Sequence, residues 1–181
     1  MFINLSIDDI EIRLLEKVHA EPLFALIEQN RAHLRPWLKW VDDTTGVGPV
    51  AEFIAISNTR HSKRKGMDAG IWFAGELVGA IGLYDVDWQA HSAHIGYWLA
   101  APHQGKGIMT RCCAGLINFC FTHLDLNRVQ IRCDPTNAPS RAIPQRLGFT
   151  CEGTLRQAAC LYGRYVDQIV FGLLRSEWTR S

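Results

Sequence analysis

The spacing of apolar residues in the first third of the chain changes from strand-like to helix-like. Alternation in IEIRLLE predicts a strand over 10–16, and EPLFALIEQNRAHL, with apolar residues three and four apart, predicts a helix over 21–34. Proline and glycine interrupt 33–50, which favours a loop, and a second helix is expected over 50–65. Its basic end, RHSKRKG, is typical of a solvated helix C-terminus followed by a glycine stop.

The middle of the chain reads as antiparallel strands. AGIWFAGELVGAIGLYDVD predicts two strands joined by a tight connection at Gly75-Glu76, and HSAHIGYWLA predicts a third. Three strands that follow one another with short connections indicate a meander.

The second half alternates between helical and extended segments. A helix is expected over 105–124, a strand over 128–133, a helix over 138–147, and strands near 149–160 and 164–175. The first of these helices carries a broad apolar stripe, made of Ile108, Met109, Cys112, Cys113, Leu116, Ile117, Cys120, Phe121 and Leu124. This stripe is typical of core packing.

A meander followed by β-α-β-α-β segments predicts the α/β class, with a mixed sheet and helices on its faces. No linker or internal repeat divides the chain, so 1–181 is expected to form one domain. Net charge is +1 and no apolar run reaches the about 20 residues that span a bilayer, so neither a nucleic-acid nor a membrane partner is indicated. The acidic start MFINLSIDDIEIRLLE is unlike a signal peptide, which predicts a cytoplasmic protein.

The six cysteines do not form a metal-binding pattern. There is no CxxC pair and no paired spacing suited to zinc, so no metal site is expected. Reduced thiols that pack in the core as small hydrophobes are the favoured interpretation.

The stretch QGKGIM places glycine where a helix should begin. The first N–H groups of a helix have no internal partners, and Gly105 and Gly107 allow an anion to approach them directly, with Lys106 adding a charge. The stretch lacks the GxxxxGK[ST] order of a Walker A loop, and Thr110 stands where a dinucleotide fingerprint needs its last glycine. A phosphate site is therefore indicated, with a purely structural glycine entry as the alternative.

The surrounding segments make the pattern far more specific. IGYWLAAPHQGKGIMT, LNRVQIRCDPTN, SRAIPQRLGF and EGTLRQA…YGRYVDQIVFGLL, in this order, resemble the GCN5-related N-acetyltransferase (GNAT) family. The chain looks most like the ribosomal-protein branch, bacterial enzymes that acetylate protein N-terminal amines. The resemblance covers nearly the whole chain. It implies the GNAT fold, a mixed and mostly antiparallel sheet with helices on both faces.

The resemblance also implies that acetyl-coenzyme A (acetyl-CoA) is bound in a split between two parallel strands, about 95–99 and 129–133. The pyrophosphate would take backbone amides from Gln104, Gly105, Lys106, Gly107, Ile108 and Met109. The pantetheine arm would run along the strand backbone of Tyr97, Trp98 and Leu99, with Asn137 and Ser140 also at the cofactor. Pro102 departs from the family's usual Gln or Arg.

The inferred reaction is direct attack of an amine on the thioester, which needs an acid and a base. Many relatives supply the acid from a tyrosine where this chain has Pro144, whereas the ribosomal-protein branch uses a serine three positions after an asparagine, matched by Asn137 and Ser140. The alternative is that this pair is a helix cap and an ordinary polar residue. His94 or an ordered water is the candidate base, because the branch's glutamate position holds Ala159.

Pro144 also has a structural consequence. Proline has no N–H, so it leaves the carbonyl of residue 140 without its helical partner, and we expect a kinked or short helix there.

The acceptor is less well defined by the sequence. Trp37 and Trp40 lie in the loop that would cover the acceptor, and Asp85 and Asp87 could attract its ammonium group, with plain packing and turn solvation as the alternatives. A protein N-terminus, possibly ribosomal, is favoured over a small amine such as an antibiotic or polyamine, and a non-catalytic CoA-binding protein is the third hypothesis. Homodimer formation is open.

Overall fold

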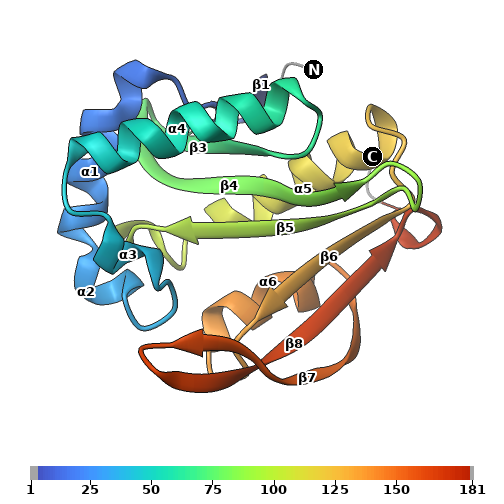
Figure 1. The fold of residues 1–181 in the computed structure, drawn as a ribbon. Helices are drawn as coiled ribbons and strands as arrows, with labels where there is room; N and C mark the ends of the chain where they lie inside the picture. The colour runs from blue at the N-terminus through green and yellow to red at the C-terminus, as the bar shows by residue number, and fades with distance from the viewer. Residues whose placement is uncertain (1–3, 180–181) are drawn as a thin grey trace.

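In the computed structural model, residues 4–179 are described, and they form an eight-stranded sheet in the order β1-β2-β3-β4-β5-β6-β8-β7 (Figure 1). Neighbouring strands are antiparallel except for β5 and β6, which are parallel. The strands are β1 Asn4–Ile7, β2 Ile10–Leu14, β3 Met67–Phe73, β4 Glu76–Asp87, β5 Ser92–Leu99, β6 Arg128–Cys133, β7 Thr150–Leu161 and β8 Arg164–Leu174. The α-helices are α1 Ala20–Gln29, α2 Arg31–Leu34, α3 Trp40–Asp43, α4 Val47–Ser62, α5 Ile108–Thr122 and α6 Ala138–Arg146.

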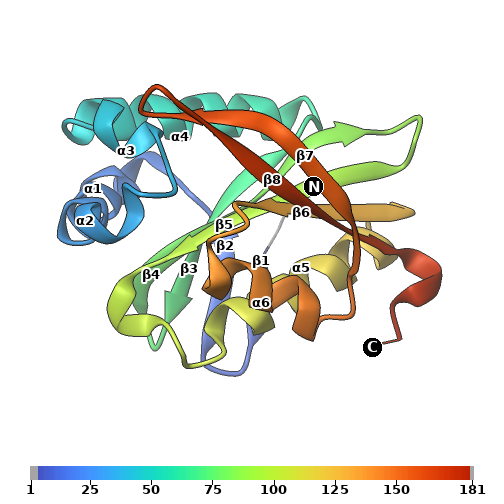
Figure 2. The same ribbon diagram turned by 90° about the horizontal axis from the view of Figure 1, so that it is seen from below.

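Helices cover both faces of the sheet, with α1 and α4 on one face and α5 and α6 on the other (Figure 2). Each face has its own apolar cluster. The larger one joins α5 to the central strands around Ile71, Leu83 and Leu116, and the smaller one packs Leu23 and Ile54 from the opposite helices. The predicted mixed, mostly antiparallel sheet with helices on both faces is confirmed.

The predicted meander corresponds to β3, β4 and β5, and one detail needs correction. The tight turn between the first two strands is at Ala74–Gly75, one residue earlier than expected, with φ of 50° and 85°. Positive φ at both central residues is typical of a type I′ turn, whose backbone twist matches the twist of the two strands that it joins.

The first helix and the loop after it differ from the prediction. The expected helix over 21–34 is divided into α1 and α2 at Asn30, because the Asn30 amide donates to the carbonyl of Leu26 at 2.8 Å and ends α1. The expected loop over 33–50 contains the short helix α3. A first strand, β1, was not predicted, although Leu5 and Ile7 alternate with polar residues.

The second predicted helix is shifted towards the N-terminus. Helix α4 begins at Val47, since Pro49 falls in its first turn, where the missing N–H would have no partner in any case. Its basic end is not wholly solvated as expected. Arg60 forms an ion pair with Asp68, which is only 3% exposed.

The six cysteines were expected to be buried, and only some of them are. Cys112, Cys113, Cys120 and Cys133 are buried, as predicted, but Cys151 and Cys160 on β7 are exposed, because β7 is the edge strand and none of its side chains is fully buried. No helix within residues 4–179 is long and apolar enough to cross a membrane.

Candidate active site

The two parallel strands β5 and β6 separate part-way along their length. They pair from Ser92 opposite Arg128 to Ile95 opposite Ile131, and no pairing joins them beyond that point. Strand β5 continues to Leu99 against β4 only, and β6 continues to Cys133 against β8 only. The backbone edge of β5 from Gly96 onwards therefore lacks a β6 partner, as the resemblance predicted for the cofactor split.

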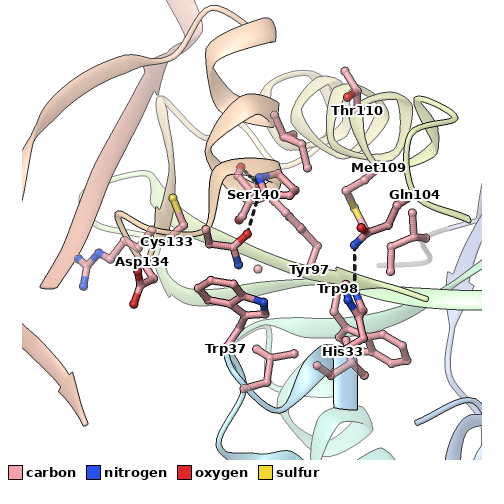
Figure 3. A pocket seen from close by; sticks show the side chains of 18 of the residues that line it. His33, Trp37, Tyr97, Trp98, Gln104, Met109, Thr110, Cys133, Asp134 and Ser140 are labelled. Carbon is pink, nitrogen blue, oxygen red and sulfur yellow. Dashed lines mark hydrogen bonds between the residues drawn. The ribbon is translucent and has the colours of Figure 1, made fainter. Parts of the chain in front are cut away.

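A cavity of about 880 Å³ occupies this split. Its volume is within the range of small-molecule sites. Residues from β5, the loop before α5, the start of α6, the α2 region and the β7–β8 hairpin line it (Figure 3). In Figure 3, Trp37 and His33 lie on one side of the cavity, and Ser140 and Cys133 lie on the other.

The glycines precede α5 instead of occupying its first turn, which corrects the expected start at 105. Gly105 and Gly107 have φ of 76° and 74°, a left-handed conformation that glycine adopts without strain. A Cβ built on either glycine meets nothing within 4 Å, so their backbone is open towards the cavity that they line. Gly107 is the N-cap of the 15-residue helix α5, whose free amides and dipole favour an anion. The loop therefore fits a pyrophosphate.

The cavity brings together nearly all of the predicted cofactor residues. Ten of them line it: Tyr97, Trp98, Leu99, Gln104, Gly105, Gly107, Ile108, Met109, Asn137 and Ser140. Lys106, the remaining one, is exposed and does not line the cavity.

Asn137 and Ser140 are arranged as the sequence predicted. The Asn137 side chain caps α6 by accepting a hydrogen bond from the Ser140 backbone N–H at 3.1 Å, and Ser140 lies in the first turn. Helix α6 spans nine residues and continues through Pro144 to Arg146, so Pro144 does not end the helix, and the expected kink stays a prediction. The Ser140 carbonyl, which Pro144 deprives of a helical donor, instead accepts from the Tyr97 hydroxyl at 3.1 Å.

Burial determines the protonation state of the groups around Ser140. It raises the pKa of the Tyr97 phenol far above its ordinary value, so the hydroxyl stays a donor. Burial also raises the pKa of the Cys133 thiol to about 11, opposed by a hydrogen bond with Ser140. Cys133 lines the cavity beside Ser140 as a neutral thiol, a placement that treating all six cysteines as core residues overlooked.

His94 lies on β5 one strand repeat before Gly96, and its side chain does not line the cavity. Its Nδ1 lies 3.2 Å from a carboxylate oxygen of Asp85. Its Nε2 accepts a hydrogen bond from the side-chain amide of Gln130 at 2.8 Å, in the amide orientation whose oxygen also accepts from Arg128. Burial, followed by the nearby Arg132 guanidinium, lowers the pKa of His94 below its usual 6.5. The imidazole is therefore neutral at pH 7. Its role as a base stays a prediction.

A buried polar network supports the strand at Gly96. The Tyr84 hydroxyl and the Arg60 guanidinium both bond the carboxylate of Asp68, which also accepts from Ser57 at 2.7 Å. The Tyr84 ring covers Gly96, where a Cβ would come within 2.9 Å of it. This close approach explains a glycine in the strand that borders the cavity.

At the side of the cavity where the resemblance places the acceptor, two groups of apolar residues form walls. Leu34, Trp37 and Leu38 form one wall, and Leu161 and Val166 of the β7–β8 hairpin form the other. The hydroxyl of Tyr162, at the hairpin tip, donates to the Arg35 carbonyl at 3.0 Å, which joins the two walls.

The predicted acceptor aromatics and acids are only partly brought to this cavity. Trp37 lines it, whereas Trp40 packs against Trp98 with ring centroids 6.1 Å apart. Asp85 and Asp87 are outside the cavity lining, and Asp87 accepts two turn amides, as the turn interpretation predicted.

Several cavity residues were missed by the sequence analysis. The sequence analysis named Ala159 only because the family branch has a glutamate at that position. It did not name five further residues that line the cavity, namely His33, Arg132, Asp134, Arg146 and Asp167. The signal for Arg132 and Asp134 was available, since Arg132 lies near the end of β6, the strand that borders the split, and Asp134 directly follows that strand. Within residues 4–179, no group of three or more His, Cys, Asp or Glu side chains is placed to hold a metal ion.

Comparisons with known proteins agree with this geometry. A family model described as "Acetyltransferase (GNAT) domain" matches residues 9–150. "Putative ribosomal N-acetyltransferase YdaF" of Bacillus subtilis (strain 168) is 38% identical over 172 residues, which cover 94% of each chain.

Two solved structures share the fold over almost the entire chain. RimL, a ribosomal L7/L12 alpha-N-protein acetyltransferase solved with coenzyme A, superposes with a TM-score of 0.91 at 27% identity, covering 96% of this chain and 98% of its own. The microcin C7 self-immunity acetyltransferase MccE, solved with acetyl-CoA and AMP, gives 0.89 at 30% identity and covers 93% of each chain. The chain belongs to the GNAT family and is an N-acetyltransferase that uses acetyl-CoA.

Proposed function

We propose that this enzyme acetylates the N-terminal α-amino group of a ribosomal protein. The observation that carries the proposal is the split between β5 and β6, which has an open glycine loop at one end and Ser140 beside it. Acetyl-CoA supplies the acetyl group as a thioester that an amine attacks directly.

The residues around the split fit each part of acetyl-CoA. The amides from Gln104 to Met109 would hold the pyrophosphate, since the helix N-terminus and the two glycines leave them open to an anion. The unpaired edge of β5 from Tyr97 to Leu99 would bond the amides of the pantetheine arm as a further strand would. Asn137 would bond the arm where it reaches α6.

The groups near the thioester have complementary roles. We assign the Ser140 hydroxyl as the donor that stabilises the departing sulfur, because it is the hydroxyl of the α6 first turn that lines the cavity. Tyr97 fixes Ser140 by bonding its carbonyl. The substrate ammonium loses a proton to a water so that the neutral amine can attack the thioester. We assign neutral His94, one strand repeat or about 7 Å from Gly96, as the base that takes the proton from this water.

The acceptor side is suited to an extended chain with a free amine. Asp134 and Asp167 line the cavity, and their carboxylates would attract an ammonium group, while the two apolar walls would contact the residues behind it. RimL and YdaF, similar over nearly the whole length, carry names that refer to ribosomal substrates.

An acetylation screen tests the proposal. Peptides with different N-terminal residues, each also in an Nα-blocked form with a free lysine, are incubated with acetyl-CoA next to polyamines and aminoglycosides, and products are identified by mass spectrometry. Acetylation of free N-termini and of neither the blocked peptides nor the small amines supports the proposal. Acetylation of small amines alone refutes it.

A small amine that carries a nucleotide is the second candidate acceptor. It is favoured by the likeness to MccE, whose solved complex holds AMP in addition to acetyl-CoA, and by Trp37, which could stack on a base. Aminoacyl-nucleotide analogues in the same screen distinguish it.

The same proposal places the enzyme in the cytoplasm, where ribosomal proteins are made. The oligomeric state stays open, and light scattering of the purified protein would decide whether it forms a homodimer.

A further inference from the structure

The junction between α1 and α2 is bonded to the segment that leads into the glycine loop. Asn30, at this junction, is 6% exposed, and its Oδ1 accepts from the backbone N–H of Ala101 at 2.8 Å. Ala101 begins a short 3₁₀ turn, Ala101–His103, whose first amide would otherwise lack a partner. The Asn30 carbonyl also accepts from the N–H groups of His33 and Leu34, which starts α2.

A second bond joins the same two segments closer to the cavity. The Gln104 amide donates to His33 Nε2 at 2.9 Å, and both side chains line the cavity. Figure 3 shows the two side chains pointing towards one another, one from α2 and the other from the glycine loop.

These contacts connect two parts of the site that have different ligands. Gln104 and the glycines belong to the proposed pyrophosphate loop, whereas Leu34, Trp37 and Leu38 form a wall of the acceptor side. Helix α2 has only four residues and ends one turn before Trp37, so its own hydrogen bonds fix it weakly. The Arg35 carbonyl is tied to Tyr162 of the β7–β8 hairpin, whereas Asn30 and His33 supply the bonds that tie this wall to the glycine-loop segment.

We propose that Asn30 and His33 are positioning residues that couple acetyl-CoA binding to ordering of the acceptor wall. An anion that fixes the glycine loop also fixes Gln104, and through His33 and Asn30 it holds Leu34, Trp37 and Leu38 in place for the acceptor. By linkage, an acceptor that orders the wall strengthens cofactor binding by the same factor. The inference rests on the proposed function for the identity of the cofactor loop.

Hydrogen–deuterium exchange with coenzyme A alone tests the coupling without a known acceptor. In the wild type, saturating coenzyme A slows exchange of the amides at 104–109 and also, by about tenfold, of those at 31–38. In His33→Ala and Asn30→Ala the slowing at 31–38 falls below about twofold, while that at 104–109 persists.

Matched variants control for other causes. His33→Gln retains a hydrogen-bonding partner for Gln104 and should keep the wild-type pattern. Asn58→Ala loses a comparable bond, from Asn58 to the Leu15 carbonyl at 3.1 Å, at a place outside the cavity lining, and should also keep it. His33 is only partly buried, so its variant tests the coupling even where Asn30→Ala folds poorly.

Two results would overturn the inference, and they differ in whether the proposed cofactor loop is also refuted. Full slowing at 31–38 in both alanine variants would show that the wall is ordered by direct contact with coenzyme A, which leaves the proposed function intact. Absence of slowing at 104–109 in the wild type would refute the cofactor loop itself, and the coupling with it.

Discussion

Replacing Gly107 by alanine separates backbone strain from loss of the phosphate site. With φ of 74°, Gly107 is left-handed, and its added Cβ meets nothing within 4 Å. The substitution therefore causes no clash in the free protein, and the left-handed conformation alone costs about 1 kcal/mol of folding free energy. In the complex, the Cβ occupies the space from which a phosphate would approach the amides.

The size of the binding defect follows from the bonds that are lost. A hydrogen bond from an amide to a charged group contributes about 1.5–3 kcal/mol, so displacing one such bond weakens coenzyme A binding by about 10- to 150-fold. Isothermal titration calorimetry with coenzyme A measures this change, and urea unfolding measures the strain.

Gly148→Ala is the matched control. Gly148 has φ of 82° and equally open surroundings, but it does not line the cavity. Its variant should lose a similar free energy of unfolding, of about 1 kcal/mol, and bind coenzyme A like the wild type. Equal coenzyme A affinity in the two alanine variants would refute the assignment of the glycine loop.

Three further predictions concern the groups at the split. Ser140→Ala should lower kcat by about 10²- to 10³-fold and leave coenzyme A affinity nearly unchanged, because it removes a transition-state donor but not the Asn137 cap. Steady-state kinetics measure kcat, and calorimetry measures the affinity. An unchanged kcat would show that Ser140 has no role in catalysis. Tyr97→Phe leaves the Ser140 carbonyl without its donor and should reduce the free energy of unfolding by about 1 kcal/mol in urea, whereas wild-type stability would show that water replaces the bond. His94 has a lowered pKa in the folded state, so the unfolded chain binds its proton more readily. Its contribution to stability is complete above the unfolded pKa of about 6.5 and is lost as pH falls from there to the lowered folded value. His94→Gln should therefore flatten the fall in urea midpoint below pH 6.5, and an unaltered pH dependence would contradict the assigned environment.

The sequence predicted those parts of the fold that depend on local periodicity. The β3–β4–β5 meander and the apolar stripe of α5 follow from residue spacing, the glycine loop follows from its residue types, and the resemblance singled out the Asn137–Ser140 pair. These features depend on neighbours in sequence, which a pattern records directly.

What could not be predicted depends on contacts between distant segments. Asn30 interrupts a continuous helical pattern because its side chain bonds Leu26 and Ala101, the latter 71 residues away. In the sequence Arg60 is one of several basic residues at a helix end, and only the fold places Asp68, from β3, against it. Likewise, Tyr97 supplies the donor that Pro144 removes, a relationship between strand and helix that no local spacing encodes.

A crystal structure of the enzyme with coenzyme A tests the central claim most directly. The account predicts pyrophosphate oxygens within about 3 Å of the backbone nitrogens of the Gln104–Met109 segment, and a pantetheine arm that bonds the β5 backbone beyond Ile95 with its thiol beside Ser140. A pyrophosphate bound away from Gly105 and Gly107, or a thiol outside the split between β5 and β6, would contradict it.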